Sequence, residues 1–136
     1  MHGTANSVHV AILDDDQAIR VALRRLLRSA GMVVEIYPDG GRFFASLALK
    51  IPDCLLLDFQ MPGLNGLDIL NHLSQRSIHI PTIVMTAHDA TGTREACINA
   101  GAMTYLHKPL DPDSLIQMIW DLRGALATPP GTYSIQ

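Results

Sequence analysis

Five short apolar runs, separated by segments with helical spacing, constrain the fold of this chain most strongly. The runs are rich in Val, Ile and Leu and occupy residues 8–13, 32–37, 54–57, 82–85 and 103–106. Short apolar runs without alternation are typical of strands that are covered on both faces. Strands that alternate with helices form a parallel sheet through right-handed crossovers, with helices on both faces. The sequence therefore predicts a doubly wound α/β domain.

The segments between these runs carry the apolar stripes of amphipathic helices. One helical face carries Ile19, Ala22, Leu23, Leu26 and Leu27, and a later one carries Leu67, Leu70 and Leu73. Two other helices are expected to bury Phe43, Phe44 and Leu47, and Leu115, Ile119, Leu122 and Leu126. One further helix is expected over residues 91–100. Asp39 and Asp111 are predicted N-caps, and Gly31 and Gly101 follow the predicted ends of two helices.

The chain has 136 residues and a net charge of −3, which fits one globular domain. We expect an N-terminal extension at residues 1–7, the domain at 8–127, and a tail or linker stub at 128–136. Because no run of Lys and Arg is present, we do not expect this domain to bind nucleic acid. No apolar stretch approaches the roughly 20 residues of a membrane span, so we expect a cytoplasmic protein without membrane contact.

The two cysteines, Cys54 and Cys97, fall in a predicted strand and a predicted helix. Their spacing is not that of metal ligands, so we expect both to be reduced residues of the core. A disulfide between them is the alternative, but it is uncommon inside cells.

Polar residues stand where four of the apolar runs end. Asp14, Asp15 and Asp16 follow the first run, Asp58 the third, Thr86 the fourth, and Lys108 comes shortly after the fifth. Open parallel sheets bind their ligands at the carboxyl ends of the strands. We therefore expect these side chains to gather at one edge of the sheet.

Such a cluster suits a divalent cation and a phosphoryl group. Carboxylates about 4 Å apart repel by roughly 4 kcal/mol per pair at an effective dielectric near 20. Mg²⁺, or Mn²⁺ in its place, offsets this repulsion, and Asp14 and Asp15 are adjacent and suited to share it. Asp58 stands alone at its strand end, is ionised without a general base, and is our candidate nucleophile toward phosphorus.

Lys108 and Thr86 would act on the oxygens of the transferring phosphoryl group, through the ammonium charge and a hydroxyl hydrogen bond. Taken singly, each is an ordinary surface or strand-end residue, and only the joint placement with Asp58 favours a site. Asp16 is better explained as the N-cap of the first helix than as a metal ligand.

These residues carry a family resemblance. The order Asp14–Asp15, Asp58 with Met61–Pro62 and Gly66 downstream, Thr86–Ala87, Tyr105 and Lys108–Pro109 resembles the receiver domain of response regulators in two-component signalling. The match covers about residues 8–127. The resemblance implies a flavodoxin-like sheet of five parallel strands in the order 2-1-3-4-5, with five helices.

The resemblance also implies a function. Asp58 would accept a phosphoryl group from the phosphohistidine of a sensor histidine kinase or of a histidine phosphotransfer protein. Mg²⁺ would be held by Asp15, Asp58 and the main-chain carbonyl of Gln60, with Asp14 joining through water. Beyond its own phosphorylation and dephosphorylation, the domain would not be an enzyme.

A conformational switch follows from the same resemblance. Thr86 and Tyr105 would form the switch pair: the Thr86 hydroxyl would move toward the phosphoryl group and the Tyr105 ring would turn inward, remodelling the face built by the fourth helix, fifth strand and fifth helix. That face would bind a partner or, on phosphorylation, a second copy of the chain. We further hypothesise that Gln60 and His88 set the lifetime of the acyl phosphate, and the Lys108–Pro109 bond is expected to be cis as in the family. Tyr105 as a plain core aromatic stays the alternative.

Other functions fit less well. An aspartate-nucleophile phosphatase of the haloacid-dehalogenase kind carries a second acid two residues after the nucleophile, where this chain has Gln60. A flavodoxin-type cofactor binder needs a phosphate cradle after the first strand, where Asp14–Asp16 would repel phosphate. The loops are most similar to receivers of helix-turn-helix transcriptional regulators, and a free-standing receiver in a phosphorelay is the alternative output.

Overall fold

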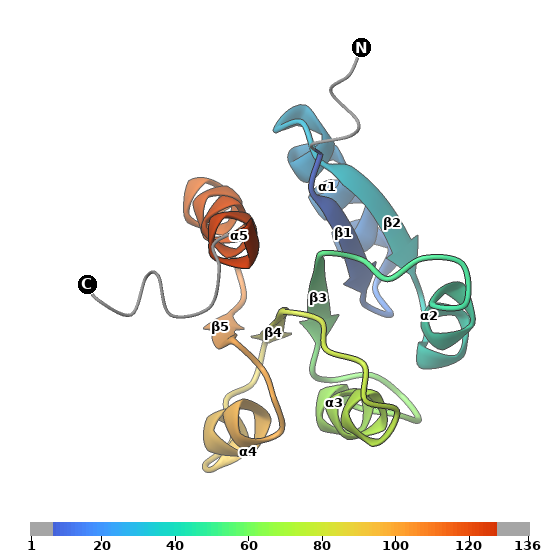
Figure 1. Ribbon diagram of the computed structural model, residues 1–136. Coiled ribbons are helices and arrows are strands. Elements are labelled where there is room, and N and C mark those ends of the chain that lie inside the picture. Colours follow the sequence, from blue (N-terminus) through green and yellow to red (C-terminus); the bar gives the residue numbers. More distant parts are fainter. Residues whose placement is uncertain (1–6, 128–136) are drawn as a thin grey trace, which may run out of the picture.

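The structure is a computed structural model that describes residues 7–127, with the side chains of residues 123–127 left aside. The predicted tail, residues 1–6 of the predicted extension and the expected burial of Leu126 therefore lie outside the described part. Five strands alternate with five helices (Figure 1). In chain order these are β1 (His9–Leu13), α1 (Gln17–Ser29), β2 (Val33–Tyr37), α2 (Gly40–Ser46), β3 (Cys54–Asp58), α3 (Gly66–Gln75), β4 (Thr82–Thr86), α4 (Thr93–Asn99), β5 (Thr104–His107) and α5 (Pro112–Ala127).

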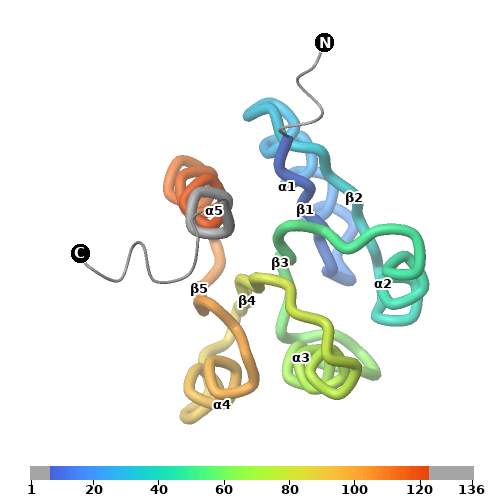
Figure 2. Tube along the Cα trace, in the orientation of Figure 1, coloured from blue at the N-terminus to red at the C-terminus, as the bar shows by residue number. Residues whose placement is uncertain are grey.

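The strands form one parallel sheet, as the sequence pattern predicts, in the order β2-β1-β3-β4-β5 that the family resemblance implies. The chain begins at β1 near the middle, winds outward through β2, and then crosses to β3, β4 and β5 (Figure 2). Helices α1 and α5 cover one face, and α2, α3 and α4 cover the other (Figure 1). The carboxyl ends of all five strands therefore point to the same edge.

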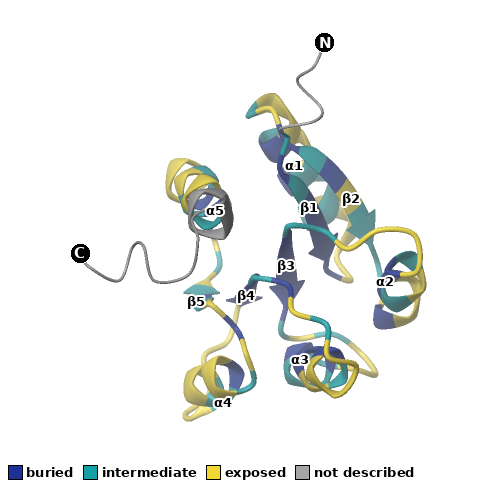
Figure 3. Cartoon of the chain, viewed as in Figure 1, coloured by how far each residue is buried: buried dark blue, intermediate teal, exposed yellow. Residues whose placement is uncertain are grey.

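The core has two layers because side chains alternate between the two faces of each strand. Leu55 and Leu57 of β3 pack with Phe43 and Leu73 on the side of α2 and α3. Leu56 packs instead with the residues of α1 and α5, which include Leu23, Leu27, Leu115 and Ile119. All five residues of β3 and of β4 are buried (Figure 3), which explains why these strands read as unbroken apolar runs.

Aspartates cap the helices where the sequence predicts them. The Asp39 carboxylate accepts a hydrogen bond from the Arg42 amide at 2.8 Å, and Asp111 accepts one from the Ser114 amide at 2.9 Å. Asp16 caps α1 in the same way and accepts from the amide of Ala18 at 2.9 Å. The interpretation of Asp16 as an N-cap is therefore confirmed.

The prediction for the fourth helix was wrong at its boundaries. Gly92 has a φ of 86°, a left-handed conformation that glycine adopts without strain, and α4 starts only at Thr93. It ends at Asn99, one residue before the predicted end. Similarly, β5 runs from Thr104 to His107 rather than from 103 to 106, and Met103 is 54% exposed.

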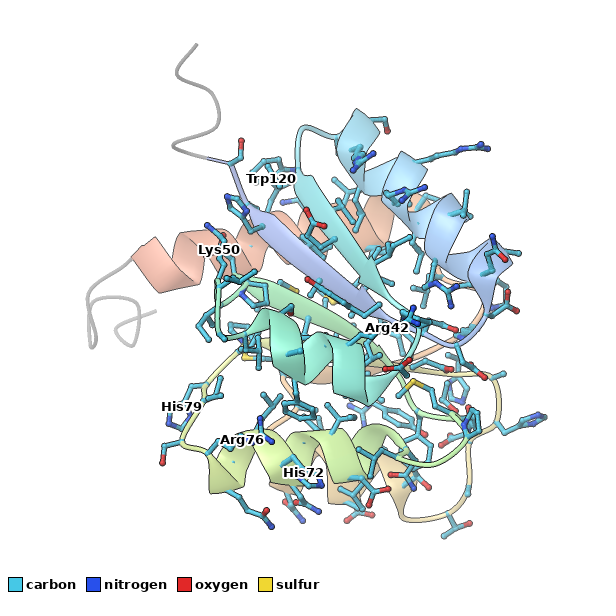
Figure 4. The ribbon with its side chains drawn as sticks, turned by 90° about the vertical axis from the view of Figure 1, so that its right-hand side faces the viewer. Arg42, Lys50, His72, Arg76, His79 and Trp120 are labelled. Carbon is cyan, nitrogen blue, oxygen red and sulfur yellow. The ribbon has the colours of Figure 1, made fainter. Side chains whose placement is uncertain are left out.

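Phe44 is only partly buried, although the sequence predicts burial for it, and the same holds for Leu122 of α5. The Arg76 guanidinium lies 4.5 Å from the centre of the Phe44 ring, and His72 approaches the ring edge with centroids 5.8 Å apart. Figure 4 shows His72 and Arg76 along α3, beside α2. The Phe44 ring thus joins α2 to α3 near the surface, where a cation–π contact replaces deeper burial.

The loop after β3 is held close to the strand end by Gly66. The Gly66 amide donates to the Phe59 carbonyl at 2.9 Å, and a Cβ at this position would lie 3.0 Å from the Phe59 Cα. Asn65 and Asp68 form a reciprocal capping box at the start of α3. These contacts fold the chain back immediately after Asp58.

Both cysteines are buried and free in the structure, as predicted. Among the helices of the described residues, none is long and apolar enough to span a membrane.

Candidate functional site

Strand register brings the predicted site residues together at one edge of the sheet. Leu13 of β1 pairs with Leu57 of β3, so Asp14 and Asp58 are the next residues of neighbouring strands. Asp58 in turn pairs with Met85 of β4, which places Thr86 one residue further along. The amide of Lys108 donates to the Thr86 carbonyl at 2.8 Å, so the chain leaving β5 reaches the same place.

A lysine bridge holds two buried carboxylates. The Lys108 Nζ donates to Asp14 Oδ2 and to Asp58 Oδ1, both at 3.0 Å. The Asp14 side chain is fully buried, the Asp58 side chain is 4% exposed, and Lys108 is 17% exposed. Buried carboxylates need such partners because an unpaired buried charge is expensive. The Lys108–Pro109 peptide bond, expected to be cis, is cis in the structure.

Burial and charge together shift the protonation of this group of residues. Burial of Asp58, reinforced by the Asp14 charge, raises the pKa of the Asp58 carboxyl to about 6, although Lys108 acts in the opposite direction. Burial disfavours the charged form of Lys108, but its hydrogen bonds to Asp14 and Asp58 outweigh this and raise the pKa of its ammonium. One lysine therefore does not fully compensate two buried carboxylates.

The remaining negative charge fits a divalent cation. Oxygens of Asp14, Asp15 and Asp58 lie within 4.8 Å of one another, and Asp15 is exposed at the mouth of the site. Three carboxylates facing one ammonium are an oxygen-rich set of the kind that Mg²⁺ prefers. The Asp14 and Asp58 carboxylates already share Lys108, so both are held in place before any ion arrives.

Thr86 is buried at the end of β4, and its hydroxyl is engaged by the neighbouring loops. The Thr86 Oγ1 lies 3.0 Å from Gln60 Oε1 and 2.6 Å from the His88 carbonyl oxygen. A hydroxyl has one proton, so it donates to one of these acceptors at a time. The Gln60 amide nitrogen also donates to the His88 carbonyl at 3.1 Å. Gln60 thus links the loop after β3 to the loop after β4.

Tyr105 points inward and is 4% exposed. Its hydroxyl donates to Asp89 Oδ1 at 3.3 Å, and His107 Nε2 lies 3.2 Å from Asp89 Oδ2. Burial raises the pKa of the Tyr105 phenol, the neighbouring Thr86 hydroxyl opposes this, and the Asp89 charge adds to it. Sequence reasoning missed Asp89 and His107. The available signal was His107 two residues after Tyr105, which puts both side chains on the same side of β5.

Comparison with known proteins is consistent across sequence and structure. A family model described as the response regulator receiver domain matches residues 10–120. The chain is 39% identical over 110 residues to the DNA-binding transcriptional regulator NtrC of Salmonella typhimurium, covering 81% of this chain and 24% of that protein. It is also 39% identical over 110 residues to the response regulator MprA of Mycobacterium ulcerans, covering 81% of this chain and 47% of that protein. The chain thus spans about a quarter and about half of these relatives.

Solved structures give the same result. The receiver domain of the Francisella response regulator 1452 superposes with a TM-score of 0.82 at 26% identity, covering 88% of this chain and 99% of that one. A response regulator receiver protein from Burkholderia phymatum is 38% identical with a TM-score of 0.76, covering 87% of this chain and 96% of that one.

The raised pKa of Asp58 predicts a pH-dependent stability in metal-free protein. In the unfolded chain the carboxyl loses its proton near pH 4, whereas in the folded chain it does so near pH 6. The folded state therefore binds more protons between these values, and the free energy of unfolding falls as the pH rises through this window. Asp58→Asn should be more stable than the parent at pH 7.5, by on the order of 2 kcal/mol, and this gain should shrink strongly at pH 4.5.

Urea unfolding in the presence of a chelator measures both proteins at the two pH values. Glu35→Gln is the control, because it removes an exposed negative charge on β2. If Asp58→Asn does not raise the free energy of unfolding at pH 7.5, or raises it equally at the two pH values, the conclusion that Lys108 does not fully compensate the two carboxylates is contradicted.

Proposed function

The chain belongs to the family of response regulator receiver domains, which are signalling domains rather than enzymes, and we propose that Asp58 is its phosphoacceptor. The observation that carries this proposal is the pairing of a buried, end-of-strand Asp58 with Lys108 at 3.0 Å, beside the carboxylates of Asp14 and Asp15. Histidine kinases phosphorylate receiver domains, and these domains bind Mg²⁺ at an acidic pocket. The arrangement supports the same chemistry here.

In the proposed reaction an Asp58 carboxylate oxygen attacks the phosphorus of a phosphohistidine. The new O–P bond forms as the P–N bond breaks, and the electron pair of that bond leaves with the imidazole nitrogen. The product is an acyl phosphate on Asp58. Lys108 already lies against Asp58 and would place its ammonium beside the phosphoryl oxygens. Mg²⁺, when held by Asp14, Asp15, Asp58 and the Gln60 carbonyl, would supply further positive charge to these oxygens.

Thr86 and Tyr105 are proposed as the switch. The phosphoryl group adds a charge of about −1.5 to −2 at the end of β3. A phosphoryl oxygen would then compete with Gln60 and the His88 carbonyl for the one proton of the Thr86 hydroxyl. Movement of Thr86 and of the loop after β4 would change the position of the Tyr105 ring, because Tyr105 is hydrogen-bonded both to Asp89 of that loop and to Arg94 of α4.

The proposed partners are a sensor histidine kinase or a histidine phosphotransfer protein as phosphodonor, in the cytoplasm. Control of transcription is the proposed output, because the relatives include a DNA-binding transcriptional regulator that is much longer than this chain. The effector would belong to a part of the protein outside residues 8–127. A receiver domain that binds no nucleic acid itself would fit a protein in which a separate effector domain binds DNA.

We also propose that phosphorylation favours a homodimer through the face of α4, β5 and α5. Ile98 on α4, Met103 before β5 and Trp120 on α5 are exposed by 38%, 54% and 37%. Large apolar side chains exposed on adjacent elements favour an interaction surface.

The first test is chemical labelling. Incubation with acetyl phosphate and Mg²⁺ should add the mass of one phosphoryl group to the intact chain, and Asp58→Asn should abolish this addition. A chelator should abolish it as well, because the carboxylates would then repel the donor. Asp53→Asn, five residues upstream and immediately before the start of β3, is the control and should label like the parent. Undiminished labelling of Asp58→Asn would refute the assignment.

The second test concerns the lifetime of the acyl phosphate. The Gln60 amide spans the two loops beside the site, so Gln60→Ala should admit water and speed dephosphorylation by about threefold to tenfold. His88→Ala leaves the carbonyl that Gln60 contacts, so its effect should be smaller. Both rates are followed by mass spectrometry after removal of the phosphodonor. If both variants lose the phosphoryl group at the parent rate, neither residue tunes the lifetime.

The third test is the size of the activated protein. After treatment with beryllofluoride, gel filtration with light scattering should show a dimer. Trp120→Ala should weaken this dimer about tenfold, because large aromatic residues dominate interfaces. Leu49→Ala is the matched control, since Leu49 is 92% exposed and lies before β3, outside the proposed face. A protein that stays monomeric after activation would contradict the proposed dimer.

A further inference from the structure

Strand β5 presents two polar-tipped rings to one carboxylate. Tyr105 and His107 are two residues apart, so their side chains project from the same side of the strand. Their ring centroids lie 6.2 Å apart at an interplanar angle of 81°. Asp89, in the loop between β4 and α4, meets both of them.

Each oxygen of the Asp89 carboxylate has its own partner. The Tyr105 hydroxyl donates to Oδ1 at 3.3 Å, and His107 Nε2 lies 3.2 Å from Oδ2. Tyr105 is almost fully buried, whereas the Asp89 and His107 side chains are 46% and 58% exposed. The imidazole therefore fixes the carboxylate from the solvent side, while the phenol approaches it from the protein interior. A buried phenol needs such an acceptor, because an unsatisfied polar group in the interior is costly.

Two further contacts lie on either side of this loop. Thr86 and His88 bind each other at its start, and Arg94 Nη1 of α4 donates to the Tyr105 carbonyl at 3.4 Å. Asp89 lies in the sequence between these two contacts, so the loop that carries its carboxylate is held next to β5 at both of its ends. Constraint lowers the entropy cost of keeping the contact.

We propose that Asp89 and His107 are positioning residues that hold the Tyr105 ring inward before phosphorylation and so set the resting bias of the switch. The inference rests on the proposed role of Tyr105 as a switch residue. Two orientations of one ring form a two-state equilibrium, and a single hydrogen bond present in only one state shifts it about fivefold. By reciprocity, a contact that favours the inward ring also favours whichever phosphorylation state prefers that ring position.

The test reads the ring directly in the unphosphorylated protein. Incorporation of 3-fluorotyrosine gives resonances for Tyr37, Tyr105 and Tyr133, and Tyr105→Phe identifies the Tyr105 signal. Asp89→Ala should move this signal toward its solvent-exposed position and increase its shift between H₂O and D₂O, and Asp89→Asn should do so to a smaller extent, because its amide oxygen still accepts a hydrogen bond but carries no charge. His107→Gln should cause a smaller change of the same sign. His107→Arg should restore the parent signal, because its guanidinium again offers an N–H donor to Asp89 Oδ2.

Glu95→Gln is the matched control, since Glu95 is an exposed acid on the neighbouring α4. Thermal melting checks that each variant is folded, and the isosteric Asp89→Asn serves if Asp89→Ala does not fold. A Tyr105 signal that keeps its parent position in the folded Asp89 variants would overturn the inference. A His107→Gln change that His107→Arg does not reverse would overturn the role of His107. Because no phosphoryl group is involved, these outcomes are separate from the labelling test of Asp58.

Discussion

The contact of one lysine with two buried carboxylates is the interaction on which the site depends. Lys108 leaves β5 and reaches Asp14 after β1 and Asp58 at the end of β3, each at 3.0 Å. It therefore ties together strand ends that are far apart in sequence. One lysine does not supply enough positive charge for both carboxylates, and the raised pKa of Asp58 is the consequence. The carboxylates of this site are held in place by Lys108 but still carry excess negative charge. Such a site favours both a divalent cation and a transferable phosphoryl group.

From this edge, a series of neighbouring residues and hydrogen bonds leads to α4 and β5. Asp58 neighbours Thr86 through the register of β3 and β4, and Thr86 contacts Gln60 and His88. One residue beyond His88, Asp89 contacts Tyr105 and His107. Spatial continuity alone does not establish coupling, which needs an element with two arrangements that both ends bias. The segment of residues 87–92 is the candidate for that element, because it contacts Thr86 on the side of the site and Tyr105 and His107 on the side of β5.

Much of the fold was predictable because its causes are local. Five apolar runs and capping aspartates such as Asp39 gave the order of elements, and strand ends marked the site. The predictions that were wrong depended on backbone conformations and side-chain rotamers, which the spacing of apolar residues does not reveal. Gly92 turns the chain at positive φ and delays α4, and Arg76 stacks on Phe44 so that the ring stays near the surface. Asp89 was missed for the same reason, since a contact between a loop and a neighbouring strand requires both to be placed first.

The energy of the proposed switch is a difference between similar hydrogen bonds. The Thr86 hydroxyl already donates to a neutral acceptor, either the Gln60 amide oxygen or the His88 carbonyl, before a phosphoryl group is present. A phosphoryl oxygen is charged, and hydrogen bonds to charged acceptors are roughly twice as strong as those between neutral groups. The gain on phosphorylation is therefore the margin between the two, not the full value of a new bond. A small margin makes the resting bias at Tyr105 important, because contacts of comparable strength, such as those of Asp89, then decide how far the equilibrium moves.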